Sequence, residues 1–269
     1  SINRSIMARD KNGIPFHPVE YNPDYPRTKC NVCGLMNSCT HGLTDAVSWF
    51  PRLPILLENG MIESIDDFVL HEWTEWSLQR IVDAQINDHK LIIDNFLHPD
   101  LLIFVLDSWP NEMYPIEVPG RTQQDIDCNT VYQFLFDKVI NDEYVKCAIA
   151  DKFALECDYE ASAWLWEDTE QFTINDVHVD YDKFNITFGL YLPLDDSIKE
   201  YGTQFWKPNE IPEDLDTSLI REDCTLIDQV PFVANTMYFM PRTRHAWHSS
   251  PIIDKPMTRR HVYGYYKSI

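Results

Sequence analysis

The hydrophobic pattern divides the first part of the chain into an irregular stretch and a helical one. Residues 1–60 are rich in Pro, Asn and Gly, and their prolines would interrupt any long helix or strand. From residue 65 to about 87 the pattern changes, and the apolar residues recur near helical spacing. We therefore predict an irregular N-terminal extension followed by one helix.

Two further patterns fill the middle of the chain. A short apolar run at residues 91–96 predicts a strand, which is ended by His98, Pro99 and Asp100. The same three residues could begin a helix that continues to Leu106. Helical spacing then returns between residues 125 and 153.

After residue 158 the pattern becomes that of strands. Residues 185–192 alternate apolar and other residues, which predicts a half-buried strand. Further strands are predicted at 161–166, 202–206, 236–240 and 261–266. Helices followed by strands indicate an α+β fold, whose β part forms a sandwich or a barrel.

Residues 194–228 have the composition of an insertion between strands. They contain many carboxylates: Asp195, Asp196, Glu200, Glu210, Glu213, Asp214, Asp216, Glu222, Asp223 and Asp228. Connecting segments usually lie on the surface, so a solvated loop is the simpler interpretation. The functional alternative is a lid over an active site.

Composition limits the classes of function. The chain has 269 residues and a formal net charge of -21, which argues against a broad nucleic-acid-binding surface. The simpler interpretation of the negative charge is that it keeps the protein soluble. The alternative is that part of it lines an acidic groove for a cationic substrate. The sequence has no run of 18 or more apolar residues, so we expect no membrane span. Seven cysteines, an odd number, with no visible secretion signal favour reduced thiols and a cytoplasmic location.

A candidate metal site begins with His178-Val179-Asp180. Residues two apart in an extended segment point to the same face, so the imidazole and the carboxylate would project together. His248, which follows a later predicted strand, could supply a third ligand. Two histidines and one carboxylate form the facial triad of non-haem iron(II) oxygenases, which leaves open positions on the metal.

Several stretches in the same order resemble the iron(II)- and 2-oxoglutarate-dependent oxygenase superfamily, near its prolyl-hydroxylase-like branch. The resemblance covers residues 90–267, about two thirds of the chain. Its stretches are 91–97 (LIIDNFL), 178–180 (HVD) with 187–192 (TFGLYL), 201–205 (YGTQF), and 235–242 (NTMYFMPR) with 246–250 (AWHSS) and 259–261 (RRH). Tyr201 stands where the family has the first glycine of a Gly-Gly-x-Leu-x-Phe stretch.

The resemblance implies a fold and a set of site residues. The fold would be a double-stranded β-helix, or jelly roll, at residues 89–269, with flanking helices and residues 1–88 as the N-terminal extension. Iron(II) would be held by His178, Asp180 and His248. Arg259 would pair with the distal carboxylate of 2-oxoglutarate, because a guanidinium grips a carboxylate with two hydrogen bonds. Tyr191 and Thr187 match positions that help to hold the same carboxylate.

The implied activity is hydroxylation of an unactivated C–H bond with dioxygen, releasing succinate and carbon dioxide. Asp180 supports this outcome, since the radical halogenases of the superfamily have a small residue there. The substrate would be a small molecule, an amino acid or a peptide side chain. Two alternatives remain: a non-catalytic jelly-roll binding module, and a cupin-type metalloenzyme that does not use 2-oxoglutarate.

Two residue assignments have close competitors. His245 competes with His248 as the distal ligand, and the Trp-His pair after a Pro-Arg turn favours His248. Arg260 competes with Arg259, and neighbours on a strand face opposite sides, so only one can enter the barrel. Aligning the aromatic end of the last strand favours Arg259, although His261 stands where the family has a small residue.

A second metal site is possible in the N-terminal extension. Cys30, Cys33, Cys39 and His41 lie within twelve positions and could complete a tetrahedral zinc site. The first pair has knuckle spacing, whereas Cys39 and His41 are unusually close in sequence. The alternative is a loop with free cysteines.

Overall fold

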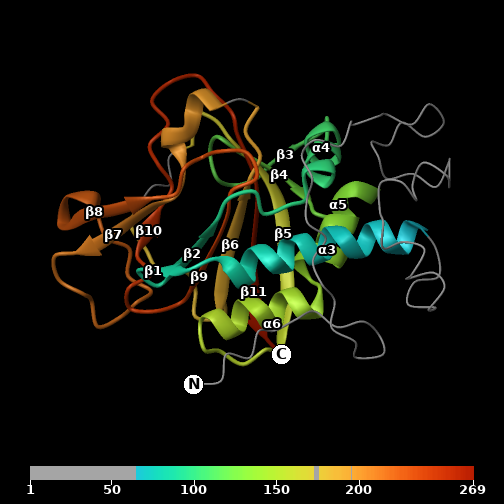
Figure 1. Cartoon of the computed structure of the whole chain (residues 1–269). Coiled ribbons are helices and arrows are strands. Elements are labelled where there is room, and N and C mark those ends of the chain that lie inside the picture. The colour runs from blue at the N-terminus through green and yellow to red at the C-terminus, as the bar shows by residue number, and fades with distance from the viewer. Residues whose placement is uncertain (1–64, 173–175, 195) are drawn as a thin grey trace.

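The computed structural model describes residues 65–172, 176–194 and 196–269 (Figure 1). Its longer helices are α3 (Ile65–Asp83), α4 (Pro99–Asp107), α5 (Thr130–Leu135), the π-helix Phe136–Ile140 that continues α5, and α6 (Glu143–Lys152), and 3-10 helices lie at Asp196–Tyr201 and Arg221–Asp223. Polar residues begin three of them, because the first backbone N–H groups of a helix need acceptors. The side chains of His98, Asn129 and Asp142 accept hydrogen bonds from the first turns of α4, α5 and α6.

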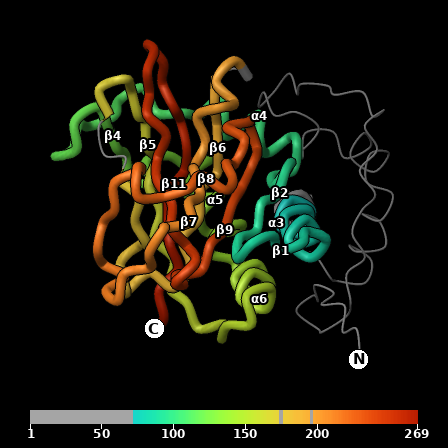
Figure 2. Tube along the Cα trace, turned by 90° about the vertical axis from the view of Figure 1, so that its left-hand side faces the viewer, coloured from blue at the N-terminus to red at the C-terminus, as the bar shows by residue number. Residues whose placement is uncertain are grey.

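The strands form two antiparallel sheets. The large sheet has the order β1-β2-β9-β6-β11-β5-β4-β3 and the small one β10-β7-β8. Strands of the large sheet are β1 (Ile86–Asn87), β2 (Lys90–Ile93), β3 (Tyr114–Pro115), β4 (Arg121–Asp125), β5 (Tyr159–Asp168), β6 (Ile186–Tyr191), β9 (Met237–Pro241) and β11 (Arg259–Ser268). Strands of the small sheet are β7 (Gln204–Pro208), β8 (Cys224–Gln229) and β10 (His248–Ser249). Figure 2 shows β11 in the middle of the large sheet.

Each face of the large sheet buries a different set of side chains. Leu165, Phe188, Val262 and Tyr266 point toward the helices and belong to the main hydrophobic core. The opposite face points toward the small sheet, and its Tyr191, Tyr238 and Met240 share a second hydrophobic cluster with Phe205 of β7. The layers are therefore helices, large sheet and small sheet (Figure 1).

The observed elements follow the predicted patterns with some differences. Helix α3 ends at Asp83, a few residues before the predicted end, and its Trp73, Leu78 and Ile81 belong to the main core. Strand β6 is buried along its whole length, so the expectation of a half-buried strand is wrong. The reason is that helices cover one face of β6 and the small sheet covers the other.

Segment 194–228, whose composition is that of an insertion, contains β7, which overlaps the strand predicted at 202–206. It also contains all but the last residue of β8, which the patterning did not predict. Residue Leu219 forms an isolated antiparallel bridge with Val177, through two backbone hydrogen bonds of 2.9 and 2.8 Å. The described acidic side chains of this segment between Glu210 and Asp223 are exposed, as a solvated surface requires.

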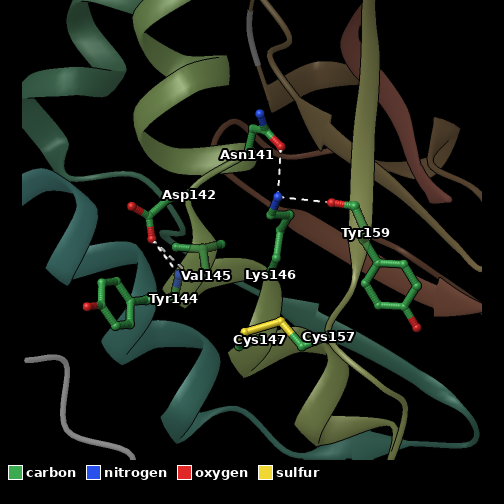
Figure 3. Close-up of a disulfide and its surroundings, with 8 residues drawn as sticks. All are labelled: Asn141, Asp142, Tyr144, Val145, Lys146, Cys147, Cys157 and Tyr159. Carbon is green, nitrogen blue, oxygen red and sulfur yellow. Dashed lines mark hydrogen bonds between the residues drawn. A yellow bond between two sulfur atoms is a disulfide. The ribbon is translucent and has the colours of Figure 1, made fainter. Parts of the chain in front are cut away.

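One cysteine pair contradicts the expectation that all cysteines are reduced. Cys147 of α6 and Cys157, just before β5, form a disulfide across a Cα–Cα distance of 4.9 Å (Figure 3). Lys146 reinforces the junction by donating hydrogen bonds to Asn141 Oδ1 and to the carbonyl oxygen of Tyr159. The thiols of Cys128 and Cys224 are free.

The predicted zinc site at Cys30, Cys33, Cys39 and His41 lies outside the described residues. Among the helices that the structure does describe, none combines the length and the apolar character that crossing a bilayer requires.

Candidate functional site

The candidate metal ligands meet where residues 178–180 lie beside β10. His178 and His248 form an antiparallel bridge, with backbone N–H···O=C hydrogen bonds of 2.9 Å in both directions. Their ring centroids lie 4.5 Å apart. Between His178 and Asp180, the side chain of Val179 points away into a small cluster with Trp206 and Trp247. The extended backbone thus aims the imidazole and the carboxylate at one point, as the sequence predicts.

Hydrogen bonds select the tautomer of both imidazoles. His178 Nδ1 lies 2.9 Å from the carbonyl oxygen of Asp176, and His248 Nδ1 lies 3.0 Å from that of Ala246. A carbonyl oxygen can only accept, so each Nδ1 carries the proton and each Nε2 offers a lone pair. Both rings are therefore prepared to bind a cation through Nε2.

Asp180 is held both at its side chain and at its backbone. Thr187 of β6 donates its hydroxyl hydrogen to Asp180 Oδ2 at 2.5 Å, and Arg242 Nε donates to the backbone oxygen of Asp180 at 2.7 Å. His248 Nε2 lies 3.7 Å from the same Oδ2. Because the threonine hydroxyl has one hydrogen and gives it to Asp180, its role here is to orient a candidate ligand.

The three side chains offer ligand atoms that all lie within 4.8 Å of one another. Within the described ranges 65–172, 176–194 and 196–269, this is the one such group of His, Cys, Asp or Glu side chains. Burial lowers the pKa of His248 to about 4, against the opposing charge of Asp180, so its ring is neutral at neutral pH. Two neutral nitrogens and one carboxylate oxygen suit a divalent transition metal such as iron(II).

A second polar cluster lies on the same face of the large sheet. The register pairs Asp168 of β5 with Arg259 of β11 on one side and with Arg121 of β4 on the other. Directly paired residues point to the same face, so the three side chains form a row. Asp168 Oδ2 accepts from Arg259 Nη1 at 2.9 Å, and the carboxylate accepts two bonds from Arg121 at 2.6 and 3.0 Å.

This row carries one positive charge in excess. Asp168 is 0% exposed and Arg259 2% exposed. Burial lowers the pKa of the adjacent His261 to about 3, which makes that ring neutral. Arg259 Nε is buried without a hydrogen-bond partner in the described structure, and so is His261 Nδ1. A buried cation with an unpaired N–H donor destabilises the folded protein unless an anion pairs with it. The cluster is therefore suited to bind the carboxylate of a ligand.

Two buried tyrosines, Tyr191 and Tyr238, lie near Arg259, and Tyr238 also lies near Asp180. Tyr191 donates to Thr203 Oγ1 at 2.8 Å and accepts from the backbone N–H of Thr203 at 2.7 Å. Burial raises the pKa of Tyr238, Asp180 raises it further and Arg259 lowers it, so this phenol lies close to both clusters. A Cβ at Gly189 would come within 2.4 Å of the Tyr238 ring, so this position has room only for glycine.

Half-buried aromatic rings continue this face of the sheet along β5 and β11. Trp166 stacks on Tyr263 with centroids 4.1 Å apart, and Trp164 lies 5.7 Å from Tyr265. Tyr265 pairs in register with Thr187, which binds Asp180. An apolar surface thus borders the candidate metal site.

The structure distinguishes the two histidines that compete as distal metal ligand and the two arginines that compete as carboxylate partner. His245 is exposed and its ring stacks on His89 at 4.7 Å, whereas His248 joins the cluster. Arg260 points to the other face, where it pairs with Glu167 at 2.8 Å. Arg259 points inward, beside Tyr191.

Sequence reasoning missed Asp168, Arg121, Tyr238 and Thr203. Asp168 and Arg121 are 47 positions apart and meet only through the pairing of β4 with β5. Strand β4 has no alternating apolar pattern that would have predicted it.

Comparisons with known proteins give structural likenesses only. No protein-family model and no curated protein matches the sequence. A prolyl-4-hydroxylase from Pseudomonas putida aligns at 14% identity over 72% of this chain and 97% of its own, with a TM-score of 0.42. HygX from Streptomyces hygroscopicus, solved with nickel and 2-oxoglutarate bound, aligns at 10% identity over 67% and 83%, with a TM-score of 0.48. A prolyl 4-hydroxylase structure from Phytophthora capsici aligns at 14% identity over 72% and 65%, with a TM-score of 0.49. At such low identities and TM-scores, the chemistry of this chain has to be derived from its own residues.

Proposed function

We propose that this chain is an iron(II)- and 2-oxoglutarate-dependent dioxygenase with a jelly-roll core, acting on a small molecule, an amino acid or a peptide side chain. One observation carries the proposal. A preorganised donor set of two imidazole Nε2 atoms and a carboxylate lies on the same interior face as a buried, incompletely paired guanidinium. A ligand that chelates a metal with one end and presents a carboxylate at the other matches both features.

The residues of the chain would divide the work. His178, Asp180 and His248 would hold iron(II), while Thr187 fixes the carboxylate and the backbone carbonyls fix the imidazole tautomers. A bound iron(II), with 2-oxoglutarate and dioxygen, would supply the oxidation of an unactivated C–H bond, with 2-oxoglutarate converted to succinate and carbon dioxide.

Arg259 would receive the distal carboxylate of 2-oxoglutarate. Its Nε is the free donor, and its Nη1 is already used by Asp168. Tyr191 lies beside it, and Phe232 covers the guanidinium, whose carbon lies 5.1 Å from the ring centroid. These groups shield the guanidinium from water, which strengthens its pairing with an anion.

The test is the addition of 2-oxoglutarate to the iron(II)-loaded protein without oxygen. We expect a weak visible absorption band, and succinate when air is admitted. His178→Ala should lose both signals. The matched control His245→Ala should keep them, because that ring is exposed, stacks on His89 and is not part of the cluster. An unchanged band in His178→Ala would refute the triad.

Arg259→Met and Arg260→Met form a second matched pair. Each removes one guanidinium, but only Arg259 faces the interior. We expect weaker 2-oxoglutarate binding in Arg259→Met alone. Iron binding with no response to 2-oxoglutarate in the unmodified protein would favour a cupin-type metalloenzyme instead.

A further inference from the structure

We propose that Arg121 is a positioning residue that controls co-substrate affinity without touching the co-substrate, by occupying Asp168 and so leaving Arg259 its positive charge. This inference rests on the proposed function and assigns a task to a residue outside the implied binding set. It follows from how one buried carboxylate is shared between two guanidinium groups.

The sharing is unequal. Arg121 binds both carboxylate oxygens of Asp168, Nε to Oδ1 at 2.6 Å and Nη2 to Oδ2 at 3.0 Å. Arg259 has a single bond, from Nη1 to Oδ2 at 2.9 Å. The negative charge is therefore engaged chiefly by Arg121, and Arg259 keeps donors for another anion.

The surroundings of Arg121 hold it in place. Its guanidinium carbon lies 3.8 Å from the ring centroid of Trp166 and 4.3 Å from that of Phe172. Gly120 precedes it with a φ of +75°, and a Cβ there would come within 2.0 Å of the backbone nitrogen of Phe172. The missing Cβ at Gly120 thus lets the backbone at Phe172 pack directly against the residue before Arg121. The rings of Trp166 and Phe172 both lie against the Arg121 guanidinium.

The charge balance gives the consequence. With Arg121 the buried row has a net charge of +1, which one ligand carboxylate neutralises. Without Arg121, Asp168 would pair with Arg259 alone, the row would be neutral, and an incoming carboxylate would compete with Asp168. At the effective dielectric of a buried site, one elementary charge a few ångströms away changes anion affinity roughly ten-fold or more.

The experiment measures 2-oxoglutarate binding to the manganese(II)-loaded protein by calorimetry, which needs no turnover. We expect Arg121→Met to weaken 2-oxoglutarate binding roughly ten-fold or more, with manganese affinity unchanged. Arg121→Lys, which keeps the charge, should recover part of the loss. The control Arg260→Met removes the same charge from the opposite face and should bind as the unmodified protein does.

A double variant separates charge from structure. Arg121→Met combined with Asp168→Asn restores a net charge of +1 on Arg259, so it should bind 2-oxoglutarate more tightly than Arg121→Met alone. If Arg121 were merely structural, the double variant would bind as weakly or more weakly, and that result overturns the proposal. If Arg121→Met does not fold, the double variant is compared with the unmodified protein, and a loss of roughly ten-fold or more overturns it.

The same binding measurements distinguish failure of the positioning role of Arg121 from failure of the proposed function. If the unmodified manganese-loaded protein does not bind 2-oxoglutarate, the dioxygenase proposal itself fails. If it binds and Arg121→Met binds equally well, only the positioning role of Arg121 is refuted.

Discussion

Asp168→Asn should destabilise the protein strongly, although it replaces one side chain with another of the same shape. The carboxylate is 0% exposed and accepts three hydrogen bonds from Arg121 and Arg259, at 2.6, 3.0 and 2.9 Å. An amide in its place leaves the buried cation Arg259 and the partly buried cation Arg121 without a counter-charge. Removing one partner from a buried ion pair costs about 3–5 kcal/mol. For a chain of this size that corresponds to a melting temperature lower by roughly 6–20 °C.

The assay is urea unfolding at pH 7 followed by tryptophan fluorescence, with Glu167→Gln as the matched control. Glu167 is the preceding residue and pairs with Arg260 at 2.8 Å, but both side chains are partly exposed. Partly exposed pairs contribute about 1 kcal/mol or less. If Asp168→Asn loses no more stability than Glu167→Gln, the row of charges does not stabilise the fold as we infer.

The pH dependence gives an independent check. Burial by itself would raise the pKa of Asp168, but the charge of Arg121 and its hydrogen bonds outweigh burial and lower the pKa below the ordinary value of 3.8. A carboxyl whose folded-state pKa is lowered adds stability above its unfolded pKa and loses it as the pH falls through the folded pKa. The difference in unfolding free energy between the unmodified protein and Asp168→Asn should therefore persist down to about pH 4 and narrow only in stronger acid.

Three other predictions concern single contacts. Thr187→Val removes the 2.5 Å hydrogen bond to Asp180 and should weaken manganese(II) binding by roughly ten-fold or more in a titration. Thr187→Ser keeps a hydroxyl and should bind manganese(II) as the unmodified protein does. Equal manganese(II) affinities of Thr187→Val and the unmodified protein would contradict the orienting role of Thr187. Burial lowers the pKa of His261 to about 3, so near pH 5 the unfolded state binds a proton that the folded state does not. As the pH falls from 7 to 5, this ring should lower the unfolding free energy by about 2 kcal/mol. Urea unfolding of His261→Phe should not show this loss. The disulfide between Cys147 and Cys157 closes a loop with a sequence separation of 10. Its reduction, or Cys157→Ala, should lower the free energy of unfolding in urea by roughly 3 kcal/mol and leave the metal affinity unchanged. Free thiols at these two positions in the folded protein, detected by alkylation and mass spectrometry, would show that the bond is absent.

The sequence by itself determined the local features of this protein. Side-chain alternation in an extended segment depends on residues two apart, so the common direction of His178 and Asp180 was already predictable from their spacing. Apolar periodicity likewise predicted α3 and β6, because each pattern repeats within a single element. Such features depend on neighbours in the chain and need no knowledge of the fold.

Only the tertiary structure decided which distant residues meet. The pairing of His178 with His248, and the row of Arg121, Asp168 and Arg259, depend on strand register across separations of tens of residues. Backbone hydrogen bonds set that register, and they use the same groups at every residue, so no local motif records the partner. A one-residue slip of β11 would place Arg260 instead of Arg259 on the interior face. The sequence thus supplied the chemical groups, while the pairing of strands placed them on one interior face.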